Sequence, residues 1–348
     1  MDVTIAGPDI REAWDAYLER SGCRYPYGLS PFLDVVEETF RHESIRLVAR
    51  NGGIICGVLP AFFLRSRLFG KLFATLPFLT YGGGAADVAE AAESLLEVGA
   101  KVARERGARF WMIRQGSLVA DHGHKLSRGF HLRSEKVHVL LPLPETTEAL
   151  SEGFRSKLRS QIRKAEKNSL VVWEGREKKD LDAFHKIFAR NMRDLGTPCY
   201  PKAFFGNILR RWNNSKILTV WKGHVPVGGA FLIGWRDWVE IPWASTDRRY
   251  NRLAPNMLLY NESLKSAIRS GYRVFDFGRS TPGEGTHQFK LQWGGEEHPL
   301  PWIYWTASGE PPVLNRRNRK FTFLSDCWKR LPLPVARILG PSIIRNIP

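Results

Sequence analysis

Cysteine is scarce and widely spaced in this 348-residue sequence. The four cysteines (Cys23, Cys56, Cys199 and Cys327) form no C-x-x-C pair and no cluster with metal-ligand spacing. This spacing predicts neither a metal site nor a disulfide framework, and it favours a reducing compartment. The N-terminal region also lacks a basic stretch followed by an apolar run, so no signal peptide is predicted.

Long apolar runs are missing as well. The most apolar stretch, residues 54–64, is interrupted by Pro60 and followed by Arg65. A helix that crosses a bilayer needs about 20 predominantly apolar residues, so this stretch is too short to span one. We therefore expect a protein that is made and kept in the cytoplasm.

Acidic residues are in the minority. The chain has 35 Asp and Glu against 52 Lys and Arg, which gives a formal net charge of +17. Such a surface favours anionic partners, which include phosphorylated cofactors, tRNA and the anionic face of a membrane. The hydrophobic share of 43%, with 12 Trp and 20 Phe, predicts a folded chain, and its length allows two domains with separate cores.

The two halves of the chain repeat one order of elements. A hairpin is predicted at 47–64, turning at Asn51-Gly52-Gly53, and a second one at 218–235, turning at Gly223. Each is followed by an amphipathic helical segment and a G-x-R-apolar strand, at 107–113 and 271–277. We infer an internal duplication with a break near 142–147, where two prolines follow a strand.

A basic amphipathic helix is predicted at 154–170. Its apolar face carries Phe154, Leu158, Ile162 and Ala165, and a basic stripe of Arg155, Arg159, Arg163 and Lys167 follows another face. Such a stripe is either a solvated helix face or a clamp for an anionic acceptor. The proline-flanked loop at 197–201 is open to two interpretations as well, because it either connects two helices or lines a substrate groove with Tyr200.

The segment 244–257 joins a predicted strand to a helix. A helix N-terminus at such a junction binds phosphate through its free backbone N–H groups and its dipole. The chain keeps the first Arg and the final Ala of a Q/R-x-x-G-x-G/A loop in Arg249–Ala254, and it has an arginine where the middle glycine is expected. The predicted donor-binding residues are Arg248, Arg249, Asn251, Arg252, Pro255 and Asn256.

The densest candidate segment is 274–295, VFDFGRSTPGEGTHQFKLQWGG. A cation beside a reacting carbonyl stabilises the developing oxyanion, and a carboxylate can orient or deprotonate the nucleophile. Lys290, Asp276 and Arg279 are the predicted catalytic residues, with a structural Asp276–Arg279 salt bridge as the alternative. Trp293 is expected to pack along the Lys290 stem on the acceptor side. His287, a lone loop histidine, is expected to be exposed.

These segments resemble the FemAB-like family of tandem GNAT proteins over nearly the whole chain. The resemblance rests on FRSKLRSQIRKAEK (154–167), FARNMRDLGTPCYPKAFF (188–205), RYNRLAPNMLLY (249–260) and FDFGRSTPGEGTHQFKLQWGG (275–295). The second of these looks like the branch associated with exosortase (PEP-CTERM) systems and their exopolysaccharide clusters. The family's F-K-x-x-W/F-G lysine falls on Lys290, its strand-end Asp on Asp276, its Pro-Asn helix start on Pro255 and Asn256, and its basic helix positions on Arg159, Arg163 and Lys164.

The resemblance implies a fold and an activity. The fold is α/β (α+β), with two tandem GNAT-like domains at 1–145 and 146–310, each a mixed, mostly antiparallel sheet flanked by helices. The implied activity is acyl or aminoacyl transfer to an amine or hydroxyl of an exopolysaccharide or cell-envelope intermediate, possible lipid-linked acceptors included. Acyl-CoA or aminoacyl-tRNA is the expected co-substrate, with no permanently bound cofactor. The alternatives are a peptidoglycan interpeptide-bridge aminoacyltransferase and a non-catalytic RNA- or membrane-docking protein.

The C-terminal tail, 311–348, is basic and amphipathic. Residues 315–348 contain eight Lys or Arg against the single acid Asp326, with aromatic and aliphatic residues between the charges. This composition suits an element lying at an anionic membrane surface, such as the inner face of the cytoplasmic membrane. The alternative is a helical tail packed against the core.

Overall fold

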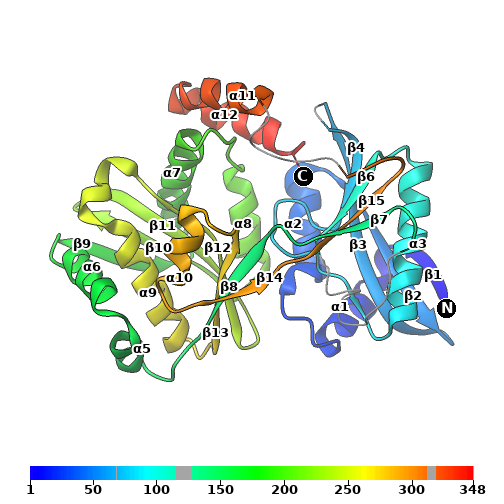
Figure 1. Cartoon of the computed structure of the whole chain (residues 1–348), viewed down its shortest axis with the longest axis horizontal. Coiled ribbons are helices and arrows are strands. Elements are labelled where there is room, and N and C mark those ends of the chain that lie inside the picture. Colours follow the sequence, from blue (N-terminus) through cyan, green and yellow to red (C-terminus); the bar gives the residue numbers. More distant parts are fainter. Residues whose placement is uncertain (68, 115–126, 312–318, 348) are drawn as a thin grey trace. The chain divides into compact units, whose positions relative to one another are not determined.

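A computed structural model describes residues 1–67, 69–114, 127–311 and 319–347. The chain forms two compact units (Figure 1). The first comprises the described residues of Met1–Val137, Pro299–Leu314 and Arg345–Pro348, and the second those of His138–His298 and Asn315–Ile344. Within the described residues, each unit contains one mixed sheet flanked by helices, so the predicted α/β class is confirmed.

The first unit is built around an eight-stranded sheet with the order β1-β2-β3-β4-β6-β15-β7, in which β5 also pairs with β3. Helix α3 covers one face, where Leu95 and Leu96 share one hydrophobic core with Leu47, Trp111 and Trp305. Its elements are β1 (Asp2–Ala6), α1 (Arg11–Arg20), α2 (Ser30–Phe40), β2 (Glu43–Asn51), β3 (Ile54–Ser66), β4 (Gly70–Ala74), β5 (Ala85–Ala86), α3 (Ala89–Glu105), β6 (Phe110–Ile113), β7 (Phe130–Arg133) and β15 (Trp302–Thr306).

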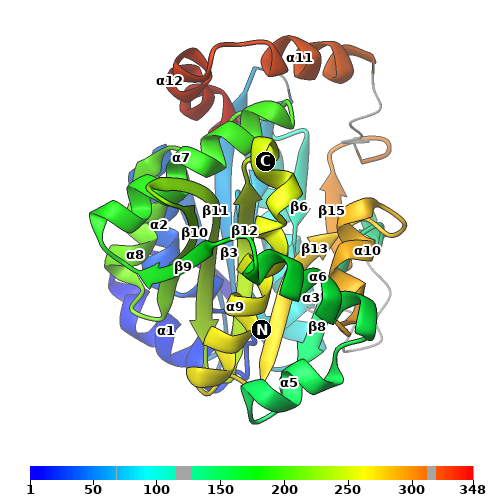
Figure 2. The same cartoon turned by 90° about the vertical axis from the view of Figure 1, so that its left-hand side faces the viewer.

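The second unit contains a seven-stranded sheet with the order β14-β8-β13-β12-β11-β10-β9. Helices α6 and α9 share one hydrophobic core with this sheet, and Figure 2 shows both on the same side of it. Its elements are β8 (Val137–Pro142), α5 (Thr147–Gly153), α6 (Ser156–Glu166), β9 (Leu170–Gly175), α7 (Lys178–Asp194), α8 (Lys202–Arg211), β10 (Ser215–Lys222), β11 (Val225–Trp235), β12 (Trp238–Thr246), η3 (Arg248–Leu253), α9 (Pro255–Arg269), β13 (Val274–Ser280), α10 (Gly285–Leu291), β14 (Glu296–Pro299), α11 (Arg319–Lys329) and α12 (Leu333–Ile344).

The internal repeat predicted from sequence is present in the structure. Both hairpins, β2–β3 and β10–β11, form, and each has a register irregularity at the equivalent place, Ala49/Arg50 in the first and Val220/Trp221 in the second. A parallel strand pair also recurs, because β4 pairs with β6 as β12 pairs with β13. Shared irregularities of this kind support a duplication, since a bulge is a specific feature of a strand pair.

The strands of the two sheets do not divide at residue 145 in the sequence, as two consecutive domains would require. Strand β8 precedes that point and joins the second sheet, whereas β15 follows β14, the last strand of the second sheet in sequence, and joins the first sheet. The change of unit falls between Val137 and His138. Pairing to a distant strand leaves no local mark in the sequence, so the prolines at 142 and 144 mark the end of β8 and not the end of a unit.

The C-terminal tail forms two helices that pack on the second unit. Both α11 and α12 lie against α7 (Figure 1). The Arg193 side chain donates a 2.9 Å hydrogen bond to the Leu331 carbonyl between the two helices, and Trp328 and Ala336 are buried. In the described part of the chain, no helix is both long and apolar enough to cross a membrane.

Candidate active site

The site lies where the parallel strands β12 and β13 diverge. The two strands pair only between Trp238–Glu240 and Val274–Asp276 within the described residues 238–280. Beyond these positions β12 continues to Thr246 and β13 to Ser280 without pairing to each other. Pro242 follows on β12 and has no N–H with which to extend the ladder. On β13, Gly278 has a φ of 72°, a left-handed conformation that turns the strand away. The ladder between the two strands thus ends at Glu240 and Asp276.

Three titratable side chains lie together at this point. Phe275 and Phe277 face the hydrophobic core, so the intervening Asp276 points to the opposite face of the sheet, where it is fully buried. Glu240 is its register partner on β12 and is also buried. On β8, His138 Nδ1 lies 3.8 Å from Asp276 Oδ2. Asp276 Oδ1 accepts a 2.7 Å hydrogen bond from the Gly278 N–H, which fixes the kinked backbone.

Lys290 is anchored beside this cluster. It lies on α10 and is 7% exposed. Its Nζ donates hydrogen bonds of 2.9 Å to the carbonyls of Gly278 and Arg279. An ammonium has three donors, so these two bonds fix its position and leave one donor for a substrate. The left-handed conformation of Gly278 therefore orients both the backbone and the amine.

The surroundings of Lys290 make it an unusual lysine. Burial lowers the pKa of Lys290 to about 8, while Asp276 and then Glu240 raise it and Arg279 lowers it. Burial is the larger effect, because removing an ammonium from water disfavours its charged form. A pKa lowered by burial in this way is a feature of catalytic lysines. The side chain of Arg279 is exposed, and the carbonyl of this residue completes the Lys290 anchor.

The predicted donor-binding segment forms the short helix η3 and the start of α9. Asp247 caps η3 and accepts hydrogen bonds from the backbone and side chain of Arg249, and Arg190 Nε lies 3.4 Å from its carboxylate. Although burial raises the pKa of Asp247, the bonds from Arg249 hold it below its usual value. Arg249 is thus engaged with Asp247, whereas Arg248 and Arg252 are exposed, as is Asn251.

The backbone explains the departure from the glycine-rich loop pattern. Ala254, the last position of the pattern, is left-handed with a φ of 56° and caps α9. Arg252 lies within η3 and is not among the residues with positive φ, so an arginine fits where a glycine was expected. Pro255 is the buried first residue of α9, and Asn256 is half-buried in the first turn. The N-terminus of a 15-residue helix therefore follows directly on the exposed arginines.

The basic helix forms as α6, somewhat shorter than predicted. Phe154, Leu158, Ile162 and Ala165 are buried, as their spacing indicated. Arg159, Arg163 and Lys164 are exposed. Arg159 donates to the carbonyls of Glu152 and Phe154, so it stabilises the start of its own helix.

Two other predicted residues lie in aromatic clusters. Tyr200 stacks on Phe188 with ring centroids 5.9 Å apart and contacts Trp243 of β12. It is half-buried and contacts the strand that carries Glu240. Trp293 is 2% exposed and packs on Phe154 and Tyr260 in the core, so its contacts are with core rings.

The sequence pattern that identified Lys290 did not identify Glu240 and His138, and it gave no role to His287 and its partner Glu297. Glu240 and His138 each stand in an apolar strand, in WVEIPW and KVHVLLP, where a charged or titratable residue is unusual. His287 is buried, contrary to the expectation of exposure. Its Nδ1 accepts from the Gly283 N–H and its Nε2 lies 2.7 Å from Glu297 Oε2. An isolated acid or histidine in a buried strand is the signal that could have identified the first two.

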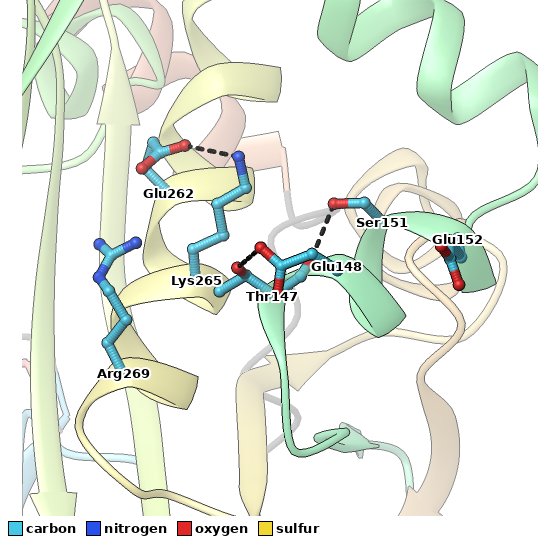
Figure 3. Close-up of a pocket in the computed structure, with 7 residues that line it drawn as sticks. All are labelled: Thr147, Glu148, Ser151, Glu152, Glu262, Lys265 and Arg269. Atoms are coloured by element: carbon cyan, nitrogen blue, oxygen red, sulfur yellow. Dashed lines mark hydrogen bonds and ion pairs between the residues drawn. The ribbon is translucent and has the colours of Figure 1, made fainter.

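A shallow pocket lies elsewhere on the second unit, between α5 and α9 (Figure 3). Several of its polar groups bind one another, because Lys265 Nζ lies 3.2 Å from Glu262 and the Thr147 hydroxyl donates to Glu148. Lys290 and Asp276 are not among its lining residues, which are Thr147, Glu148, Ser151, Glu152, Glu262, Lys265 and Arg269. The candidate site is therefore the cluster at the β12–β13 divergence, which is separate from this pocket.

The fold is a tandem GNAT architecture, and comparisons with known proteins agree at the level of the fold. Residues 152–291 match the model of the acetyltransferase (GNAT) domain family, a range that includes Glu240, Asp276 and Lys290. FemX has the same fold, with a TM-score of 0.64 at 15% identity over 88% of this chain and 97% of that chain. A comparison with curated protein sequences gave no match.

Two further solved structures share the architecture. A tandem GNAT protein from the clavulanic acid biosynthesis pathway gives a TM-score of 0.54 at 12% identity, over 89% of this chain and 99% of that chain. The C-terminal domain of a protein named as a lysylphosphatidylglycerol synthetase, from Agrobacterium fabrum, gives 0.54 at 12% identity, over 78% and 86%. The prediction of two tandem GNAT-like domains is confirmed at the level of the fold.

Proposed function

We propose that this protein is an acyl- or aminoacyl-transferase that acts on a cell-envelope or exopolysaccharide intermediate. The observation that carries the proposal is Lys290, a buried amine held by two backbone carbonyls beside Asp276 and Glu240, at the point where two parallel strands separate. A structural lysine gains little from this position, because burial of an ammonium costs free energy. The match of residues 152–291 to an acetyltransferase domain supports the same assignment.

The proposed reaction moves an acyl group from an activated donor to an amine or hydroxyl. The nucleophile attacks the acyl carbonyl, a C–N or C–O bond forms, and the bond to the thiol of CoA or to the ribose oxygen of tRNA breaks. The third donor of the Lys290 ammonium stabilises the oxyanion formed in between. The nucleophile's proton passes to a carboxylate, Glu240 or Asp276, and then to the leaving group.

The donor is proposed to run along the diverging strands to the start of α9. Both donor classes carry phosphate groups, and the exposed Arg248 and Arg252 with the N-terminus of α9 provide a cationic binding surface for them. Arg249 contributes by holding Asp247 and so fixing the loop. The acceptor is proposed to bind near Tyr200, on the α7 face of the sheet. The basic helix α6, with Arg159, Arg163 and Lys164, lies on the opposite face with α9 and is proposed as a second cationic surface for it.

The acceptor is proposed to be a lipid-linked intermediate at the inner face of the cytoplasmic membrane. The shared fold with a protein named as a lysylphosphatidylglycerol synthetase supports transfer to a lipid-borne acceptor. An exosortase-associated exopolysaccharide pathway is the narrower form of this proposal, and it rests on the sequence resemblance at 188–205.

A thermal-shift titration with CoA, acetyl-CoA and aminoacylated tRNA tests the donor. A ligand that binds only the native state raises the melting temperature, by an amount that grows with the ratio of its concentration to its Kd. We expect one class to stabilise the protein, and Arg248→Ala/Arg252→Ala to reduce that shift. Arg269→Ala is the matched control, because this arginine is exposed at the opposite end of α9.

Each result has a defined meaning. Stabilisation by a CoA species assigns an acyl-CoA donor, and stabilisation by charged tRNA alone assigns aminoacyl transfer. If no donor raises the melting temperature and the protein binds RNA without turnover in a salt-sensitive way, the transferase assignment fails and a binding role replaces it.

A further inference from the structure

The two C-terminal helices carry exposed apolar side chains on the surface away from the fold. Phe323 is 69% exposed on α11, and Ile338 is 75% exposed on α12. Further exposed apolar residues of these helices are Leu324, Val335, Leu339 and Ile343. Single exposed apolar residues are normal on a protein surface, but a set of six on two consecutive helices indicates a binding surface. We call these six residues the tail surface.

The exposure does not result from loose packing of the helices. On α12, Ala336, Gly340 and Ile344 recur every four residues and are buried. A Cβ at Gly340 would lie 3.0 Å from the backbone nitrogen and the sulfur of Cys199, so the helix approaches this loop closely. A neighbouring face of α12, about 100° around the helix axis, carries the exposed Val335, Leu339 and Ile343, again four residues apart. The helix is thus apolar on two faces, of which the fold uses one.

Cations accompany the tail surface, and acids are nearly missing. Lys329, Arg330 and Arg337 lie on the same two helices or directly after α11, and all are exposed. The single acid in 315–348, Asp326, lies 2.9 Å from Lys329 Nζ. No other acid in this segment can neutralise the two arginines. Apolar side chains on a segment with a net positive charge match a ligand whose surface is anionic and whose interior is apolar.

We propose that the tail surface binds the surface of an anionic lipid bilayer, with α11 and α12 in the headgroup region. Phe323, Ile338 and their neighbours enter the acyl boundary, while Arg330 and Arg337 contact lipid phosphates. A second copy of this chain is a poorer partner, because two such segments, each with a net charge of +7 over 315–348, repel each other. The inference does not depend on the transferase assignment.

Vesicle flotation tests the proposal with the full chain. The probes are vesicles of phosphatidylcholine mixed with phosphatidylglycerol, and vesicles of phosphatidylcholine alone. Phe323→Ser/Ile338→Ser removes two exposed apolar side chains, and Arg330→Ala/Arg337→Ala removes two cations. Each pair should weaken the partition into anionic vesicles by about tenfold or more. For the arginine pair, each basic residue near such a surface contributes about a fivefold factor. For the apolar pair, binding strength scales with the apolar area that enters the bilayer.

Matched variants control for composition and folding. Ile54→Ser/Trp173→Ser removes apolar side chains that are 72% and 64% exposed on β3 and β9. Lys101→Ala/Lys178→Ala removes two exposed lysines of α3 and α7. Both should float like the unaltered protein. Because all substituted side chains are exposed, the melting temperatures should stay unchanged, and this is measured alongside.

The results that overturn the proposal are equally specific. The proposal fails if the unaltered protein floats with neither vesicle type, or binds neutral vesicles as well as anionic ones. It also fails if the control pairs lose as much binding as the tail pairs. If sedimentation shows instead that the chain self-associates and that Phe323→Ser/Ile338→Ser abolishes this, the tail surface joins two copies and does not bind lipid.

Discussion

At the scale of single residues, Lys290 and Lys265 show how position decides the chemistry of one side chain. Lys265 lies in the shallow pocket, where its amine is 3.2 Å from Glu262 on the same helix. Lys290 is buried against backbone carbonyls, and its pKa is lowered to about 8. Lys265 can therefore serve as the control when Lys290 is substituted.

Lys290→Met is expected to reduce turnover by about 10²–10³-fold, because it removes the donor that stabilises the oxyanion. Turnover is measured as donor consumption with the donor class that raises the melting temperature. Lys265→Met should retain nearly full activity. Equal losses in both variants, or a fully active Lys290→Met protein that still melts normally, would show that Lys290 is not catalytic.

The activity should also depend on pH through this amine. If the charged form is required, kcat/KM falls as the pH rises through about 8, by about tenfold per pH unit above it. Asp276→Asn removes the carboxylate that raises the pKa of Lys290 most, so the falling limb should move to lower pH. A rate that instead rises above pH 8 would make Lys290 a general base.

The sequence indicated Lys290 and Asp276 but not their neighbours. Both lie in a glycine-rich segment with a recognisable pattern, whereas Glu240 and His138 join the site through strand register. Glu240 is paired with Asp276 across 36 positions of sequence, and His138 belongs to a strand that precedes the rest of its unit. Such pairings are decided by the packing of the whole sheet and leave no local pattern.

At the scale of elements, the kink at Gly278 connects the path of a strand to the position of the amine. The residue has a left-handed φ of 72°, and its carbonyl accepts a bond from Lys290. Gly223 has a φ of 57° in the β10–β11 turn, where a Cβ would meet no atom within 4 Å. The two glycines thus share a conformation but not a role.

Alanine at either position should cost about 1–2 kcal/mol of stability, because an L-residue is strained in the left-handed region. Gly278→Ala should also lower turnover by about tenfold or more, since a small shift of the carbonyl displaces the Lys290 amine. Urea unfolding and donor consumption measure the two effects. A Gly223→Ala protein with the same loss of turnover would refute the positioning role of Gly278.

Elements with local signals were the ones that the sequence predicted well. The hairpin turns at Asn51-Gly52-Gly53 and at Gly223 form as expected, because their glycines supply positive φ. The buried face of α6 follows from the spacing of Phe154, Leu158 and Ile162. The helix is shorter than predicted because Ser169, with a φ of 53°, and the strand from Leu170 end it. The tail likewise forms helices, but their packing on α7 is a tertiary contact.

At the scale of the whole molecule, the two units repeat the same strand pairing but carry different side chains at the equivalent positions. The parallel pair of the first unit aligns Ala74 with Met112, where the second unit aligns Glu240 with Asp276. Buried carboxylates are thus present at one of two equivalent positions. The difference follows directly from the aligned sequences, and it supports placing the chemistry in the second unit.

The distribution of strands predicts which fragments fold. A fragment of residues 137–299 keeps β8 and β14, which complete the second sheet, whereas 146–310 lacks β8 and carries β15 without its own sheet. We expect 137–299 to unfold cooperatively and 146–310 to aggregate, because loss of β8 uncovers the edge of β13 beside Asp276. Both fragments lack α11 and α12, so the comparison isolates the strands. Circular dichroism and urea unfolding measure the outcome, and a well-folded 146–310 would restore the linear boundary near residue 145.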